Sequence, residues 1–136
     1  MAWVYFNPNP DNKSVEDCTV RAICRAENMS WEDAYFSLCI MGAIVHDMPN
    51  ANYVFHRLLA EWGYTYAPVE NTCPHCYTVA DFCADHSEGC FILGTGTHVI
   101  AVIDGNYFDA TDSGSEIPLH CYHKEEGQLI DFPETE

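Results

Sequence analysis

Near residue 89 the apolar pattern of the chain changes its period, and this change limits the folds that are open to it. Before residue 89, apolar side chains recur at intervals of three and four residues, which is typical of amphipathic helices. After it, short apolar runs alternate with glycine-containing turns, which is typical of strands. A chain whose helices precede its strands favours the α+β class.

Three short sequences have the form of a helix-capping box, in which a hydroxyl residue is followed three residues later by an acid. They are Ser14-Val-Glu-Asp17, Ser30-Trp-Glu-Asp33 and Thr78-Val-Ala-Asp81. They predict a helix from about residue 14 to Asn28, a second helix from residue 30, and a short helix that ends at Gly89. A further helix is expected at about 50–62, ended by Gly63.

The predicted sheet is built around one hairpin. Residues 98–103 and 107–111 form its strands, and Asp104-Gly105-Asn106 forms the turn. Other strands are expected at 64–67, 90–93 and 117–123. Residues 1–13 look irregular or edge-like, because their Asn-Pro-Asn-Pro-Asp-Asn run disfavours regular structure.

Length and charge restrict the functional classes. The chain has 136 residues, of which 48% are hydrophobic, and this predicts a single domain over 1–136 with an acidic tail over 124–136. The formal net charge of -16 repels phosphate groups, so direct nucleic-acid binding is not expected, whereas a basic protein partner is compatible with it. Because we find no membrane-length apolar run and no basic flank of a signal peptide at the start, we expect a cytoplasmic protein without membrane contact.

Cys18 is the candidate nucleophile. It lies in the first turn of the first predicted helix, where unpaired backbone amides and the helix dipole stabilise a thiolate relative to a thiol. Attack on an acyl carbon needs this thiolate, together with a base that can later protonate the leaving group. Cys18 also falls on the apolar stripe of its helix, so its alternative role is in the core.

His98 is the candidate base, because it begins a predicted strand directly after the loop Gly94-Thr-Gly-Thr97. Imidazole titrates near neutral pH, as a base requires, and a third polar group should orient its ring. A three-residue hairpin turn would pair His98 with Asp112, which we favour. A two-residue turn would place His98 opposite Thr111 or Ser113. Asp109 would then lie on the same face at least two residues further along, out of direct reach of the ring, and it is held in reserve.

This order of residues resembles the papain-like cysteine peptidase superfamily, including its bacteriocin-processing branch. Asp17-Cys18 at a helix start is similar to the Asp-Cys start of NlpC-type enzymes. The segment from His98 to Asp112 resembles the His strand, glycine turn and Asp strand of the transglutaminase-like branch. The whole chain looks like small uncharacterised papain-like proteins of phages and bacteria, and the matching segments are Asn7–Pro10, Asp17–Ala22, Ser30–Tyr35 and His98–Gly114.

The resemblance implies a papain-like α+β fold, in which the nucleophile helix packs on a C-terminal antiparallel β-sheet. It implies a Cys18, His98 and Asp112 triad that acts on a peptide, isopeptide or amide bond of a peptide or protein, with no cofactor. For a phage-encoded member the compartment would be the host cytoplasm. The superfamily often uses a Gln before the Cys as oxyanion donor. Here Asn12 is the candidate substitute, and the Cys18 amide supplies one donor in any case.

Two alternatives remain open. The first is a structural zinc site, formed from the C-x-x-C pair and the ligands that follow it: Cys73, Cys76, Cys83, His86 and Cys90. We instead expect no metal, with the eight cysteines mostly reduced as core and loop thiols, and with His120 and His123 on an edge strand. The second alternative is a non-enzymatic acidic interaction protein of the phage anti-defence or DNA-mimic type, on a degenerate peptidase fold.

Overall fold

The computed structural model describes residues 2–70 and 72–124. Within them the chain forms four helices and six strands, so the α+β class is confirmed. The helices are α1 (Cys18–Glu27), α2 (Trp31–Val45), α3 (Asn52–Glu61) and α4 (Val79–Asp85). The strands are β1 (Trp3–Tyr5), β2 (Thr65–Pro68), β3 (Cys90–Gly94), β4 (Val99–Ile103), β5 (Asn106–Asp109) and β6 (His120–Lys124). The tail predicted over 124–136 lies outside the described residues, apart from Lys124.

All six strands join one sheet in the order β1-β5-β4-β3-β6-β2. The pairs are antiparallel except that β1 runs parallel to β5, so the sheet is mixed and not purely antiparallel as expected. The parallel strand β1 comes from the segment 1–13 that was expected to be irregular or edge-like. Its Trp3 indole donates a hydrogen bond to the Asp109 carbonyl on β5 at 3.0 Å. The prediction of an edge strand for His120 and His123 is wrong, because β6 lies between β3 and β2.

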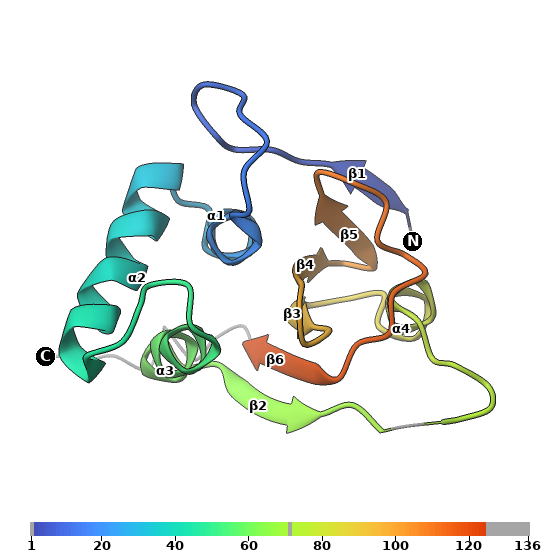
Figure 1. Cartoon of the computed structure of the whole chain (residues 1–136). Coiled ribbons are helices and arrows are strands. Elements are labelled where there is room, and N and C mark those ends of the chain that lie inside the picture. The colour runs from blue at the N-terminus through green and yellow to red at the C-terminus, as the bar shows by residue number, and fades with distance from the viewer. Residues whose placement is uncertain (1, 71, 125–136) are drawn as a thin grey trace, which may run out of the picture.

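Helices cover both faces of the sheet (Figure 1). Helix α1 lies between α2 and the sheet, with α3 beside them, and α4 covers the opposite face. Strand residues alternate between the two cores: Ile92 and Ala101 pack with α1–α3, whereas Leu93, Ile100 and Val102 pack with α4. Both faces are buried, which explains why these strands appear in the sequence as continuous apolar runs.

Two of the three predicted capping boxes begin helices as expected. The Ser30 hydroxyl accepts a hydrogen bond from the Asp33 amide at the start of α2, and Thr78 and Asp81 form a reciprocal box at the start of α4. The prediction for Ser14 is wrong, because α1 begins only at Cys18. Its N-cap residue is Asp17, whose carboxylate makes no capping hydrogen bond.

The hairpin between β4 and β5 has a two-residue turn. Ile103 pairs with Asn106, which leaves Asp104 and Gly105 as the turn residues. Both have positive φ, 50° and 80°, as a type I′ turn requires. If the same pairing is continued to the residue before β4, His98 lies opposite Thr111. The three-residue turn that would pair His98 with Asp112 is therefore excluded.

Candidate active site

Cys18 and His98 line the same cleft, where the start of α1 reaches the sheet. Cys18 is the first residue of α1, which packs against β4 and β5. His98 directly precedes β4, and interaction with the Asp109 side chain and then with the Cys18 side chain raises the pKa of its ring. Cys18 is half-buried, so the structure brings the two predicted residues together without removing the sulfur from the surface.

A tight turn before β4 holds His98 in place. The Thr95 amide donates to the His98 carbonyl at 2.8 Å and so closes the turn. Gly96 within this turn has a φ of +100°, a conformation that an L side chain strains. The Gly-Thr-Gly-Thr sequence therefore has a positional role, because it sets the imidazole at the end of the sheet with its side chain 20% exposed.

Asp109 is the carboxylate that contacts the His98 ring. Its Oδ2 atom lies 2.5 Å from His98 Nε2, and the residue is only 1% exposed. Further donors satisfy the carboxylate: the Ser113 hydroxyl at 2.8 Å, the Ala110 amide at 2.7 Å and the Arg21 guanidinium. A buried acid with this many donors is fixed in position and remains charged.

The prediction that Asp112 orients His98 is therefore wrong. The Asp112 carboxylate instead accepts hydrogen bonds from the Tyr107 hydroxyl at 2.5 Å and the Gly114 amide at 3.0 Å. The Tyr107 bond and then the Gly114 bond lower the pKa of Asp112. The expectation that Asp109 would be out of direct reach is also wrong. Asp109 lies diagonally across the strand pair from His98, and the imidazole ring is large enough to span that separation.

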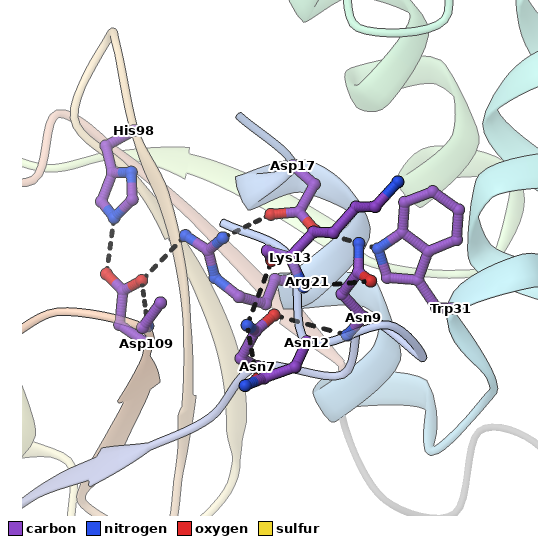
Figure 2. A network of polar contacts seen from close by, with 10 residues as sticks. Asn7, Asn9, Asn12, Lys13, Asp17, Arg21, Trp31, His98 and Asp109 are labelled. Atoms are coloured by element: carbon purple, nitrogen blue, oxygen red, sulfur yellow. Dashed lines mark hydrogen bonds and ion pairs between the residues drawn. The ribbon is translucent and has the colours of Figure 1, made fainter. Parts of the chain in front are cut away.

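Arg21 connects Asp109 to the start of α1 (Figure 2). Its Nη2 atom lies 2.9 Å from Asp109, and its Nη1 atom lies 2.5 Å from Asp17. The Trp31 indole donates a hydrogen bond to the other oxygen of Asp17 at 2.9 Å. Asp17 and Arg21 are 6% and 8% exposed, so the network lies inside the protein. Arg21 and Trp31 also draw the Asp17 carboxylate away from the helix amides that it would otherwise cap.

Sequence reasoning missed Arg21, although one signal of its position was present. Asp17 and Arg21 are spaced i, i+4, so on a helix they form an ion pair, and Arg21 sits between the apolar residues Val20 and Ala22. A cation within an apolar helical segment indicates a buried partner. Nothing local indicated that this partner is Asp109, 88 residues further along the chain.

The network favours a charged histidine. The hydrogen bond with Asp109, followed by the one with Cys18, raises the pKa of His98 to about 10. Burial alone would raise the pKa of Asp109, but hydrogen bonds from His98 and Ser113 and the charges of His98 and Arg21 lower it. The resting form at neutral pH is thus an imidazolium beside a carboxylate, which differs from the near-neutral titration expected of His98.

The reacting groups open onto a cleft of about 500 Å³. Cys18, Thr19 and His98 lie along it. Its remaining lining is rich in aromatic rings and imidazoles, and includes Tyr53, His56, Tyr66, His120 and Tyr122. Of these residues, only His120 was singled out from the sequence, and it was expected on an edge strand. The volume lies within the range of small-molecule and peptide sites.

Asn12 does not serve as the expected oxyanion donor in this arrangement. It occupies an exposed turn with a φ of 55°, its side-chain oxygen faces the Asn7 amide at 3.5 Å, and it is not among the described residues that line the cleft. The Cys18 amide remains as a donor, because no side chain caps the start of α1.

The residues proposed for a zinc site lie on different elements of the fold. Cys83 is buried on the core face of α4, and His86 stacks on Phe82 with a centroid distance of 3.8 Å. Cys90 begins β3, whereas Cys73 and Cys76 are exposed on a loop. In the described ranges no three His, Cys, Asp or Glu side chains converge as metal ligands would.

Comparison with protein families, curated proteins and solved structures finds no match to this chain. In the described part of the chain, none of the helices combines the length and apolar character that crossing a membrane requires.

Proposed function

We propose that the chain is a papain-like cysteine hydrolase or acyl-transfer enzyme that acts on an amide, peptide or isopeptide bond. The observation that carries this proposal is that Cys18 and His98 line one cleft, with the His98 ring held by the buried carboxylate of Asp109. A thiol, an imidazole and a buried carboxylate in this order are the components of nucleophilic acyl transfer.

In the first step, the Cys18 thiolate attacks the carbonyl carbon of the substrate. A C–S bond forms, the C–N bond breaks, and the His98 imidazolium gives its proton to the departing amine. Protonation of His98 in the resting state supports this order, because the ring holds the proton that the leaving group needs.

In the second step, the neutral His98 ring accepts a proton from water, and the resulting hydroxide equivalent attacks the thioester. The C–S bond breaks, a carboxylic acid is released, and the imidazolium is restored. An amine in place of water gives acyl transfer by the same route. Asp109 stabilises each imidazolium state and prevents the ring from turning, since its Oδ2 atom lies 2.5 Å from Nε2.

The uncapped start of α1 supplies donors for the oxyanion of each tetrahedral intermediate. The Cys18 amide lies in the first turn, where helix N–H groups have no intrahelical acceptor. Because Arg21 and Trp31 bind the Asp17 carboxylate, this acid does not compete with the oxyanion for those amides.

Acyl-enzyme trapping tests the proposal. We expect p-nitrophenyl acetate to release a burst of nitrophenol and to leave one acetyl group on Cys18, identified by peptide mass mapping. Cys18→Ala should abolish the burst, whereas Cys76→Ala, which removes an exposed loop thiol, should retain it. An equal burst from Cys18→Ala, or acetyl groups spread over the exposed thiols, would contradict the proposal.

The net charge of -16 supports a second candidate, an acidic protein that occupies a basic site on a partner. This candidate does not need the thiol. A biological effect that Cys18→Ala retains in full, together with partner binding that weakens as salt is added, would favour it over the enzyme.

A further inference from the structure

A second, smaller pocket adjoins the catalytic cleft. It has a volume of about 200 Å³ and shares Glu16, Thr19 and Asn50 with the cleft. Thr19 follows Cys18 directly in α1, so the pocket begins one residue from the nucleophile. When Cys18 attacks a carbonyl group of a substrate, a substrate side chain close to that carbonyl can therefore reach this pocket.

The walls of this pocket are mainly apolar. Among the lining residues, Val15 is 46% exposed, while Val20 and Leu38 are buried. Trp31 and Tyr35 form a stacked aromatic pair on one wall, with ring centroids 5.1 Å apart and an angle of 11° between the rings. Because Trp31 also donates a hydrogen bond to Asp17, the wall is tied to the same network that holds Asp109.

We propose that this pocket binds one large aliphatic or aromatic side chain of the acyl substrate and so determines which substrates Cys18 attacks. The inference rests on the proposed function. Sites for whole small molecules usually measure about 300–1,000 Å³, so a pocket of about 200 Å³ suits a single side chain.

Charge restricts the occupant further. The carboxyl residue Glu16 borders the pocket, where the Asp17 carboxylate is already paired with Arg21, and the chain as a whole carries a net charge of -16. An acidic side chain would meet like charge here and would lose its hydration among apolar walls. The favoured residue is therefore Leu, Met or Phe, and the disfavoured residue is Asp or Glu.

A series of dipeptide vinyl sulfones tests this specificity. Probes that carry Leu, Phe, Ala, Gly or Asp at either of the two positions differ only in the side chain offered to the pocket, and each alkylates a reactive thiol. We expect a Leu or Phe probe to modify Cys18 at least roughly 10-fold faster than the Gly probe at one position, and the Asp probe to be slowest.

Two variants locate the preference. Val15→Gln and Tyr35→Ala should each reduce the ratio of Leu-probe to Gly-probe rates to within about 2-fold of unity, because each removes an apolar wall. Ile40→Gln is the matched control, since Ile40 is 62% exposed on α2 and does not line the pocket. The ratio, unlike a single rate, is insensitive to changes in the reactivity of Cys18 itself.

The outcomes separate this inference from the proposed function. Equal rates for Leu and Gly probes at both positions, with Cys18 still alkylated rapidly by iodoacetamide, would overturn the pocket assignment alone. A preference that survives both variants would overturn it as well. A Cys18 that reacts with neither reagent would overturn the proposed function and the inference together.

Discussion

The guanidinium of Arg21 on α1 lies 2.9 Å from the carboxylate of Asp109 at the end of β5. The same group binds Asp17, so one cation contacts two buried acids. The second acid is balanced by His98, which stays protonated because of Asp109. Buried ion pairs often add little net stability, because desolvation offsets their attraction. The main consequence here is positional, since Arg21 fixes the acid that orients His98.

Replacement of Arg21 by Met should lower the free energy of unfolding by about 3–5 kcal/mol, because it removes the cation that pairs with buried Asp17 and leaves buried Asp109 with His98 alone. Urea unfolding followed by circular dichroism measures this loss. Arg57→Met is the control, since Arg57 contacts only the exposed Tyr53 ring and hydroxyl among the interactions of the described residues. A loss from Arg21→Met no larger than that from the control would show that the network does not hold α1 to β5.

The two candidate acids can be separated by a matched pair of substitutions. Asp109→Asn should slow acylation of Cys18 by p-nitrophenyl acetate by roughly 10²-fold or more, because the amide no longer stabilises the imidazolium. Asp112→Asn should change this rate by less than about 3-fold, since Asp112 binds Tyr107 and Gly114 instead. The reverse order of effects would restore Asp112 as the orienting residue.

The raised pKa of His98 predicts how stability depends on pH. The ring binds its proton more tightly in the folded protein, with a pKa of about 10 against an ordinary 6.5. Its contribution is therefore complete below pH 6.5 and is lost as pH rises toward 10. Unfolding free energies at pH 6, 8 and 10 should show the advantage of the native chain over His98→Gln shrinking across this range. An advantage that is constant or grows with pH would contradict the charged His98.

Local signals predicted the parts of this fold that local interactions determine. Ser30 and Thr78 cap helices as expected, and the glycine loop sets His98 directly before β4. The choice of acid depended on whether Asn106 belongs to the hairpin turn or to the strand. Asp, Gly and Asn all accept positive φ, so the sequence could not decide between the two registers.

The contacts of Arg21 lay beyond sequence reasoning for a different reason. Helical spacing indicates its pair with Asp17, but the pair with Asp109 depends on how α1 packs on the sheet. The same packing explains why the helix predicted to begin at Ser14 begins later. Asp17 is bound by Arg21 and Trp31, and the helix begins after it at Cys18.

The two serines of the predicted capping boxes should therefore respond differently to alanine. Ser30→Ala should reduce the free energy of unfolding by about 1 kcal/mol, because the Asp33 amide loses its acceptor. Ser14→Ala should have no measurable effect, since Ser14 is exposed and precedes the helix by several residues. Equal losses in thermal or urea unfolding would mean that α1 begins earlier in solution.

The selectivity of iodoacetamide among the cysteines tests the activated thiol most directly. Burial raises the pKa of Cys24, Cys83 and Cys121 to about 11, so these thiols should react slowly at pH 7. The informative competitors are the exposed Cys73 and Cys76, which have better access than the half-buried Cys18.

Time-resolved peptide mapping at pH 7 should show Cys18 alkylated at least roughly 10-fold faster than either exposed cysteine, and His98→Gln should remove this advantage. Alkylation in order of exposure alone, unchanged by His98→Gln, would contradict a reactive pair of Cys18 and His98.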